Sequence, residues 1–293
     1  MEEKAVGRRE RRPRGPAPER AGGPPGRRSA SVSEGLGAFS LAGRVAIVNG
    51  GGGGLGSAIA DGFAAAGARV AVTGRSREPL EATVERAKAR GSEGLAITAD
   101  VTQEDDAERM VGEVVDRFGR VDIVVNAVGG GAGKALHAAH EYPRDAWDWI
   151  MELNLRSTIV PTQPAVRAMI AAETRGAVLN ISSVRANLGI NAGYSAYVAA
   201  KGAISSLTRQ WATEWARFGI RCNAIMPTFV DTPQVASLLA DPAFKAGIVG
   251  RIPLGRVGET SDIAGPAIFL CSDAAAFITG QVLAIDGGLT ATQ

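Results

Sequence analysis

The sequence predicts a single doubly wound α/β domain, in which a seven-stranded parallel sheet carries helices on both faces. Two observations lead to this fold class. From residue 41 onward, short apolar runs alternate with longer segments in which apolar residues recur every three or four positions. The short runs are apolar throughout, and strands of this kind are typical of parallel sheets that helices cover on both sides. In such a sheet, functional loops are expected at the carboxyl ends of the strands.

The expected strands follow one another with a helical segment or a long loop between them. They cover residues 44–48, 69–73, 95–100, 121–126, 177–182, 220–225 and 281–286. Glycines are placed to end the first two helices, at Gly67 and Gly91, and Thr102 is placed to open the third. Pro161 and Pro164 predict a kink or a break in the helical segment that follows residue 154.

Charge and composition separate the chain into two parts. The 293 residues carry a formal net charge of +2, and 45% of them are hydrophobic, enough for one large domain. Residues 1–40 hold nine Lys or Arg against five Glu, together with much of the proline. We interpret them as a disordered basic extension and residues 41–293 as the folded domain. A nucleic-acid or membrane binder acting through the N-terminal arginines is a minor alternative.

Targeting and redox signals are sparse. No apolar run follows the arginine pairs, so the N-terminal segment does not fit a secretory or twin-arginine signal, and its Glu residues do not fit a mitochondrial presequence. No stretch of about 18 apolar residues could span a membrane. Cys222 and Cys271 lie in apolar surroundings typical of reduced core thiols. We therefore expect a cytoplasmic protein.

The run "VNGGGGGLG" follows the first strand and precedes the first helix. Glycines at such a junction let backbone amides approach a phosphate, and the positive end of the helix favours negative charge. This position argues against a flexible linker and for a nucleotide site. Two registers fit the letters: Gly51, Gly53 and Gly56 match G-x-G-x-x-G, whereas Gly50, Gly54 and Gly56 match G-x-x-x-G-x-G.

A second group of residues indicates proton-transfer chemistry. Tyr197 and Lys201 are four residues apart in a helical segment, so their side chains share one face. An ammonium beside a phenol favours the phenolate and is expected to lower the tyrosine pKa. The strand at 177–182 brings Ser183 to its carboxyl end, and Asn154 lies on a helix after the fourth strand.

At this point the chain resembles the classical short-chain dehydrogenase/reductase family. The resemblance covers residues 41–293 and rests on motifs in family order: "NGGGGGLG", "ADV" (99–101), "DIVVNAVG" (122–129), Asn154, "ISS" (181–183), "YVAAK" (197–201), "RCNAIMPTFVDT" (221–232) and "IDGG" (285–288). It implies a Rossmann-type fold and an NAD(P)(H)-dependent enzyme that interconverts a secondary alcohol and a ketone. It also implies a homotetramer, or a homodimer, with helices near 154–170 and 197–216 at the main interface.

The resemblance assigns roles to the four polar residues. Tyr197 is implied to be the acid/base, Ser183 to hydrogen-bond the reacting oxygen, Lys201 to lower the tyrosine pKa and hold the ribose, and Asn154 to keep a water in a proton relay. The interval from Ser183 to Tyr197 is one residue longer than is usual, so Ser182 is an alternative. The family register makes Gly50, Gly54 and Gly56 the structural glycines, and Gly51 to Gly53 then fill positions where relatives carry side chains near the 2′-phosphate.

Cofactor choice depends on the end of the second strand. Gly74 stands where an NAD-selective Asp is usual, and Arg75 and Ser76 suit a 2′-phosphate, which favours NADP(H) over NAD(H). The basic residue that often precedes the second family glycine is missing, since Gly53 stands there. The expected cofactor contacts are Asn49, Gly50, Gly52, Gly53, Gly54, Leu55, Gly56, Arg75, Ser76, Asp100, Val101, Asn126, Ala127, Val128, Gly129, Tyr197, Lys201, Pro227, Val230 and Thr232.

The substrate is the least determined feature. The expected contacts are Ser183, Arg185, Tyr194, Tyr197 and Thr228, within or beside segments 130–142, 184–196 and 231–255. The chain looks similar to gluconate-type sugar-acid and polyol dehydrogenases and to 3-oxoacyl carrier-protein reductases, and fold analogy does not separate them. A catalytically silent dinucleotide-binding scaffold or sensor is an alternative from another class. No metal site is expected, because His137 and His140 lack a neighbouring carboxylate or Cys cluster.

Overall fold

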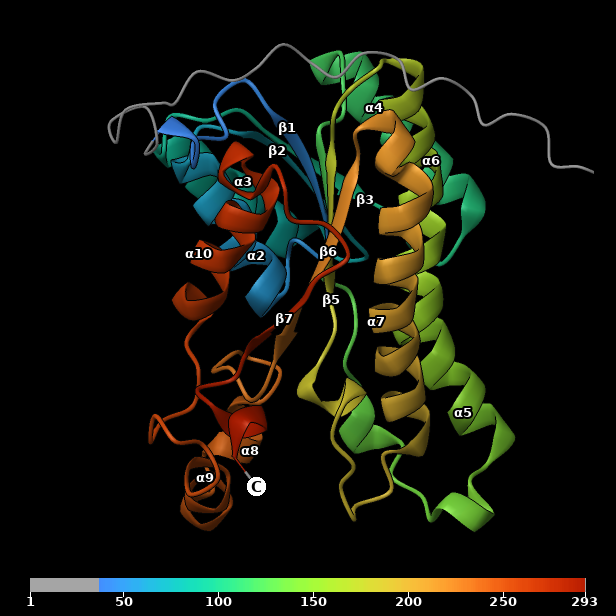
Figure 1. Ribbon diagram of the computed structural model, residues 1–293, viewed down its shortest axis with the longest axis vertical. Coiled ribbons are helices and arrows are strands. Elements are labelled where there is room, and N and C mark those ends of the chain that lie inside the picture. Colours follow the sequence, from blue (N-terminus) through green and yellow to red (C-terminus); the bar gives the residue numbers. More distant parts are fainter. Residues whose placement is uncertain (1–36, 293) are drawn as a thin grey trace, which may run out of the picture.

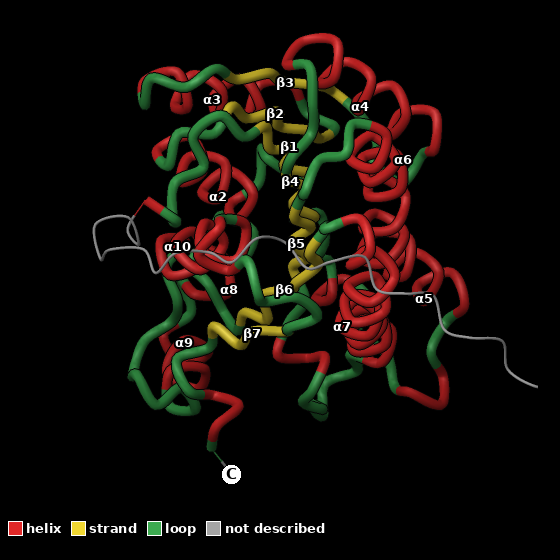
Figure 2. Tube along the Cα trace, turned by 45° about the horizontal axis from the view of Figure 1, so that its top comes forward, coloured by secondary structure: helices red, strands yellow, loops and turns green. Residues whose placement is uncertain are grey.

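Seven parallel strands form one sheet in the computed structural model, which describes residues 37–292. The strand order is β3-β2-β1-β4-β5-β6-β7, so successive strands are added toward one edge as far as β3 and toward the other edge from β4 onward. Figure 1 shows the sheet between its helices, and Figure 2 labels all seven strands. The predicted seven-stranded parallel sheet is thus confirmed. The strands are β1 (Val45–Asn49), β2 (Arg69–Gly74), β3 (Gly94–Thr98), β4 (Ile123–Asn126), β5 (Ala177–Ile181), β6 (Arg221–Pro227) and β7 (Val282–Ile285).

Helices cover both faces of the sheet (Figure 2). One face carries α2 (Gly54–Ala65), α3 (Arg77–Ala89) and α10 (Thr260–Cys271), and its core includes Phe63, Leu80 and Ile263. The other face carries α4 (Glu104–Phe118), α6 (Ser157–Ala171) and α7 (Ser195–Trp215), and its core includes Met110, Met169 and Trp211. Two short helices, α8 (Ala236–Leu239) and α9 (Pro242–Val249), lie between β6 and α10 in the chain.

Helix ends follow the sequence signals with one exception. Gly67 and Gly91 follow α2 and α3 with φ of +96° and +80°, the left-handed backbone expected of glycine beyond a helix end. The expectation for Thr102 was wrong, because α4 begins at Glu104 with Gln103 as its N-cap. The Thr102 hydroxyl instead donates to Asp100 Oδ1 at 2.8 Å. A local side-chain bond therefore replaces the expected cap.

The helical stretch containing the two prolines does not break at them. Residues 144–171 form α5 (Arg144–Met151), a π-helical turn (Glu152–Arg156) and α6, and both Pro161 and Pro164 lie inside α6. The departure from α-helical geometry instead lies in the π turn, which contains Asn154. Hydroxyls of Ser157 and Thr158 donate to carbonyls four residues earlier, at Leu153 and Asn154. These bonds stabilise the junction between the π turn and α6.

The segment before β1 packs against α10 and the turn after it. Ala274 N–H donates to the Ala38 carbonyl at 2.9 Å, and the Phe39 ring lies 5.9 Å from that of Phe269. Most of the extension expected at residues 1–40 lies outside the described residues. Within residues 37–292, no helix combines the length and apolar character that crossing a bilayer requires.

Candidate active site

The glycine loop after β1 excludes side chains at the three glycines of the family register. Gly50 has φ of +78°, and a Cβ there would lie 2.9 Å from the Ala127 carbonyl carbon and oxygen. A Cβ on Gly54 would lie 2.6 Å from Thr232 Cβ, and one on Gly56 would lie 2.2 Å from the Gly50 carbonyl oxygen. The loop, the end of β4 and the segment after β6 therefore approach one another more closely than any other residue type permits.

The other glycines of the run differ among themselves. A Cβ on Gly51 would meet Val72 at 2.6 Å, and one on Gly52 would meet Pro79 at 3.0 Å, so both positions face protein. The family register suggested that positions 51 and 52 carry side chains near the 2′-phosphate in relatives. In this chain a Cβ at either position would instead meet protein atoms. Gly53 is the least crowded of the three, since the Gly50 oxygen at 3.3 Å is the single atom within 4 Å of its Cβ.

The N-terminus of α2 suits a diphosphate. Its N-cap, Gly53, offers no side-chain cap, and the first turn contains no acidic residue. The N–H groups at the start of a helix and the helix dipole favour a negative ligand at this point. The loop is held in place from behind, because the buried Thr83 hydroxyl of α3 donates to the Gly51 carbonyl at 2.9 Å. These residues fit the diphosphate of a dinucleotide.

A row of buried amide side chains crosses the sheet beneath the loops. Asn49 Nδ2 donates to Asn126 Oδ1 at 2.9 Å, and Asn126 Nδ2 donates to Asn180 Oδ1 at 2.9 Å. Thr73 donates to Asn49, Asn126 also donates to Thr162 on α6, and Asn180 donates to Thr208 on α7. The side chains of Asn49 and Asn126, expected at the cofactor, are thus committed inside the sheet. Only their backbone remains available to a ligand.

The expected adenosine contacts lie at the ends of β2 and β3. Arg75 and Ser76 are exposed after Gly74, and within the described residues Arg75 forms no ion pair. Asp100 is half-buried, and its Oδ1 accepts from the Thr102 backbone at 3.1 Å. Val101 is almost fully buried and packs in the core beside α4. Its contribution to an adenine site is therefore limited to its backbone.

Ser183 and Ser182 face different partners, which distinguishes the two candidates. Ser182 is buried, and its hydroxyl lies 2.8 Å from that of Ser205 and donates to the Lys201 carbonyl. The Ser183 oxygen instead accepts from the Arg185 N–H at 3.2 Å, and the Ser183 hydroxyl acts to lower the pKa of Tyr197. Ser182 therefore attaches β5 to α7, whereas Ser183 is the serine that acts on the tyrosine.

Lys201 is buried at 3% exposure, and its ammonium lies over the Tyr197 ring. Its Nζ lies 5.7 Å from the Tyr197 ring centroid and donates to the Ile181 carbonyl at 2.9 Å. Ile181 follows Asn180, the last residue of β5 that pairs with β4. Burial lowers the pKa of Lys201 to about 8.

The pKa of Tyr197 is raised, which corrects the expectation that the neighbouring ammonium lowers it. Burial is the main cause, and the hydrogen bond with Ser183 and the charge of Arg185 oppose it. The phenol is therefore held in its protonated form. A protonated phenol is a proton donor, which is the form that carbonyl reduction requires.

Asn154 is fully buried in the π turn and holds the loop after β4. Its Oδ1 accepts from Gly130 N–H at 2.8 Å, and its Nδ2 donates to the carbonyls of Gly130 and Ile150. A Cβ on Gly129 would lie 2.8 Å from Asn154 Oδ1 and 3.0 Å from Lys201 Nζ. Only a glycine thus fits between the asparagine, the lysine and the expected cofactor site. Both ends of the Asn154 amide are therefore hydrogen-bonded to the backbone.

The segment after β6 closes over the glycine loop. Val230 forms a parallel bridge with Gly258, and Thr232 is 9% exposed against Gly54. Pro227 ends β6, and Thr228 follows it at the reacting end of the sheet. Gln234, which the sequence did not indicate, donates to the Gly129 carbonyl at 3.4 Å. Polar residues on such loops have no periodicity, so no sequence signal pointed to it.

The expected substrate-facing segments come together around Tyr197. The Tyr194 ring lies 6.3 Å from that of Tyr197, edge to face. His137 N–H donates to the Gly193 carbonyl at 3.3 Å, joining segments 130–142 and 184–196. Burial lowers the pKa of Arg185, and the charge of Arg251 lowers it further.

Other chemistries find less support among residues 37–292. No group of three or more His, Cys, Asp or Glu side chains is placed to hold a metal ion there. His140 is exposed, and His137 packs edge to face against Tyr142 at 5.2 Å.

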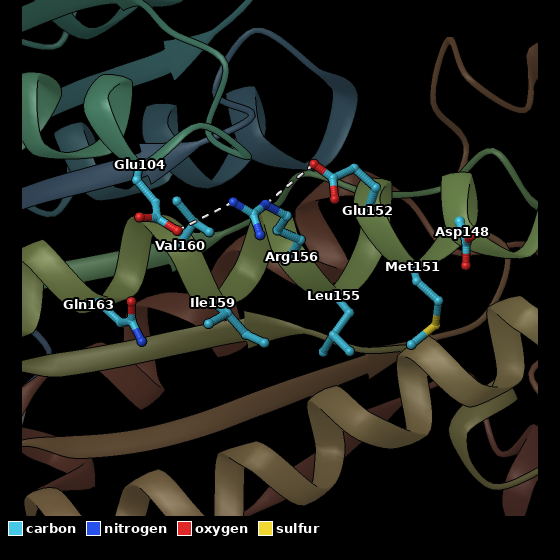
Figure 3. Close-up of a pocket in the computed structure, with 9 residues that line it drawn as sticks. All are labelled: Glu104, Asp148, Met151, Glu152, Leu155, Arg156, Ile159, Val160 and Gln163. Carbon is cyan, nitrogen blue, oxygen red and sulfur yellow. Dashed lines mark hydrogen bonds and ion pairs between the residues drawn. The ribbon is translucent and has the colours of Figure 1, made fainter. Parts of the chain in front are cut away.

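A groove of about 500 Å³ lies on the outer side of the helix that carries Asn154 (Figure 3). It contains none of the expected catalytic residues.

Comparisons with known proteins agree with this geometry. Residues 51–290 match a family model described as Enoyl-(Acyl carrier protein) reductase. The chain is 35% identical over 252 residues to gluconate 5-dehydrogenase of Gluconobacter oxydans (strain 621H), covering 86% of this chain and 96% of that one. It is 38% identical over 253 residues to 2-dehydro-3-deoxy-D-gluconate 5-dehydrogenase of Escherichia coli (strain K12), covering 86% and 98%.

A solved structure shares the whole fold. The crystal structure of a gluconate 5-dehydrogenase from Burkholderia cenocepacia J2315, in complex with NADP and tartrate, superposes with a TM-score of 0.81 at 33% identity, covering 88% of this chain and 99% of that one. The chain therefore belongs to the short-chain dehydrogenase/reductase family and is an NAD(P)-dependent oxidoreductase that interconverts a secondary alcohol and a ketone.

Proposed function

We propose that the protein is an NADP(H)-preferring dehydrogenase of small sugar acids or related hydroxy and keto compounds. The observation that carries the proposal is the group at the carboxyl end of β5. Tyr197 and buried Lys201 share one face of α7 one turn apart, with Lys201 Nζ 5.7 Å from the Tyr197 ring centroid, and the Ser183 hydroxyl acts on the pKa of Tyr197. The relatives named for gluconate and 2-dehydro-3-deoxy-D-gluconate support the substrate class.

The side chains divide the proposed chemistry among them. A bound nicotinamide supplies or accepts the hydride. The Ser183 hydroxyl and the Tyr197 phenol together hold the substrate oxygen, and Tyr197 gives it a proton during reduction or takes one during oxidation. Lys201 keeps a positive charge beside the ring at neutral pH. Asn154 fixes the Gly130 backbone and so the wall of the nicotinamide site.

Preference for NADP(H) rests on the end of β2. Gly74 offers no carboxylate to the ribose, while Arg75 and Ser76 are exposed there. Solved relatives with bound NADP support the same assignment. A guanidinium at this position would pair with the 2′-phosphate that distinguishes the two dinucleotides.

Arg75→Ala tests the preference against a matched control. The variant is expected to weaken NADPH about tenfold, the size of one charge-assisted hydrogen bond, and to leave NADH nearly unchanged. Arg77→Ala serves as the control, because Arg77 lies two residues away and its Nε pairs with Glu81 at 2.6 Å. Fluorescence titration of both dinucleotides measures the affinities. Equal weakening of NADPH and NADH by Arg75→Ala would refute the phosphate role.

A substrate screen separates the two proposed substrate classes. Initial rates with NADPH and NADH would be measured on 5-keto-D-gluconate, neutral ketoses, β-keto thioesters and cyclic ketones. Sugar-acid specificity predicts the highest kcat/KM with the keto acid. Highest activity on a β-keto thioester would instead favour a carrier-protein ketoreductase. The crystal structure of the relative that holds tartrate, a hydroxy diacid, supports the first outcome.

We also propose that the enzyme is a cytoplasmic homotetramer, or a homodimer, with a main interface on α5, the π turn, α6 and α7. Met151, Leu155 and Ile159 point to the same side of this helix (Figure 3). The same groove contains both acidic and basic groups, Glu152 and Arg156 among them, which is compatible with the self-complementary surface of an isologous interface. Two free, buried cysteines support a reducing compartment.

Light scattering tests the interface. Ile159→Glu would place a charge in the apolar part of the groove and is expected to yield monomers. Leu238→Glu changes an exposed residue on α8 and is expected to leave the mass unchanged. A wild-type monomer, or an Ile159→Glu variant that remains a tetramer, would contradict this assignment.

A further inference from the structure

One side chain joins the segment after β6 to the loop after β4. Gln234 Nε2 donates to the Gly129 carbonyl at 3.4 Å, across 105 positions of the sequence. A Cβ on Gly130, whose φ is +110°, would clash with the same Nε2 and would lie 2.9 Å from Gln234 Cδ. The Gln234 amide therefore lies directly against the backbone of Gly129 and Gly130, in space that any side chain at position 130 would occupy.

A β-turn carries Gln234 to that position. The Val235 N–H donates to the Thr232 carbonyl at 3.0 Å, which places Pro233 and Gln234 at the two central positions of the turn. Proline presets the backbone of the first central position, so the turn loses little conformational entropy when it forms. Thr232 lies against the glycine loop, since a Cβ on Gly54 would meet Thr232 Cβ at 2.6 Å. The turn thus extends from the glycine loop to the loop after β4.

Both ends of this turn lie at residues expected to contact the dinucleotide. Gly54 begins α2, whose N-terminus suits the diphosphate. At the other end, a Cβ on Gly129 would lie 3.0 Å from Lys201 Nζ, and the family resemblance places Lys201 at the nicotinamide ribose. The turn and its contact with Gly129 therefore border a dinucleotide that extends from the start of α2 to Lys201.

The contact can open at small cost while the base of the segment stays in place. Gln234 is exposed, and 3.4 Å is longer than most N–H···O hydrogen bonds. The residues just before the turn are held more firmly, because Val230 forms a parallel bridge with Gly258 and Thr232 is buried against the glycine loop. Opening is thus confined to the part of the segment that follows Thr232.

We propose that Gln234 is a positioning residue that acts as a latch: its hydrogen bond to the Gly129 carbonyl holds the 232–235 turn closed beside the bound dinucleotide and limits the rate at which the dinucleotide dissociates. Gln234 acts through the backbone of the loop after β4 and takes no part in proton transfer. The inference needs a bound dinucleotide, which the family membership supplies, but it depends neither on the proposed substrate nor on the preference for NADP(H).

Stopped-flow fluorescence measures the latch without any substrate. Enzyme loaded with NADPH is mixed with excess NADP⁺, and the loss of bound-NADPH fluorescence gives the dissociation rate constant; NADH and NAD⁺ are used in the same way. Gln234→Ala and Gln234→Glu are each expected to raise this constant about threefold to tenfold, because both remove the donor to the Gly129 carbonyl. Ser237→Ala changes an exposed residue of α8 in the same segment and is expected to leave it unchanged.

A double-mutant cycle with Gly130 tests the contact itself. Gly130→Ala places a Cβ against the Gln234 amide, so it is expected to raise the dissociation rate constant in the wild-type background by displacing that side chain. In the Gln234→Ala background the same substitution meets no amide, and its remaining effect measures the backbone strain at a φ of +110°. A smaller effect of Gly130→Ala in the second background supports the latch, and equal effects in the two backgrounds would overturn it.

Hydrogen–deuterium exchange separates a local latch from a general loss of structure. In the protein without dinucleotide, Gln234→Ala is expected to speed exchange in peptides that cover the 232–235 turn, where the Val235 N–H is bonded, and to leave peptides from α2 and the melting temperature unchanged. Unchanged dissociation of the dinucleotide in Gln234→Ala would overturn the latch. Faster dissociation accompanied by faster exchange throughout the domain would overturn it also, because Gln234 would then act on stability alone.

Discussion

Lys201 is expected to lower the stability of the protein at neutral pH, and Lys201→Met measures by how much. Burial lowers the pKa of this lysine from 10.5 to about 8. This lowering of the Lys201 pKa corresponds to a loss of about 3 kcal/mol in the free energy of unfolding, at about 1.4 kcal/mol per pKa unit. Below pH 8 the folded protein carries a buried charge that the unfolded chain keeps in water, so the full cost applies.

The sign of the pH dependence follows from proton binding. Between about pH 8 and 10.5 the unfolded chain binds the lysine proton and the folded protein has lost it, so the free energy of unfolding rises with pH. The wild-type protein is therefore expected to gain about 3 kcal/mol relative to Lys201→Met from pH 7 to 11. Methionine also leaves the Ile181 carbonyl without its donor, at a cost of about 1–3 kcal/mol that does not vary with pH.

The assay is urea unfolding of both proteins at several pH values from 7 to 11. The difference between the two unfolding free energies is the observable, since other titrating groups cancel in it. Lys88→Met serves as control, because Lys88 is exposed and pairs with Glu85 at 2.8 Å. A wild-type and Lys201→Met difference that stays constant over this range would refute the argument.

Three further predictions concern the site. Tyr197→Phe should reduce turnover at least about 100-fold with dinucleotide affinity retained in fluorescence titration, and wild-type turnover would remove the tyrosine from its role. Gly56→Ala should lower the melting temperature and the dinucleotide affinity, since its Cβ would lie 2.2 Å from the Gly50 oxygen. Gly53→Ala should resemble wild type, since its Cβ would lie 3.3 Å from the same oxygen. Equal effects of the two variants would contradict the register. Initial rates of reduction should fall above about pH 8, because Lys201, whose pKa is about 8, then loses its charge. Tyr197, whose pKa is raised, stays protonated over the same range. A rate profile that is flat to pH 10 would contradict this prediction.

Periodicity predicted the fold because burial on both faces of a strand leaves a strong pattern. All seven strands lie within three residues of their expected bounds, and Gly67 and Gly91 end their helices as expected. Of the expected kink or break at Pro161 and Pro164, no break occurs, because α6 continues through both prolines and the irregular turn lies earlier, around Asn154. Local sequence rules identify the missing N–H of a proline but do not locate a π turn several residues earlier.

The site was predictable where residues share a helix or follow a strand. The spacing of Tyr197 and Lys201 placed them on one face, but it did not show that the lysine would donate to Ile181 or that burial would dominate the tyrosine pKa. Spacing carries no information about solvent access. Gln234 was missed for a related reason: its partner, the Gly129 carbonyl, lies 105 residues earlier in the chain, on a loop whose approach only the folded chain reveals.

The amide row through Asn49, Asn126 and Asn180 has a consequence for redesigning the enzyme. A shift of β1, β4 or β5 by one residue would leave buried amides unpaired, so side chains reinforce the backbone register of the three central strands. The distance between the glycine loop and Ser183 is thereby determined below the surface, independently of the loops themselves. Residues such as Gly53 and Arg75 should therefore accept changes that alter dinucleotide preference while the hydride-transfer geometry is preserved.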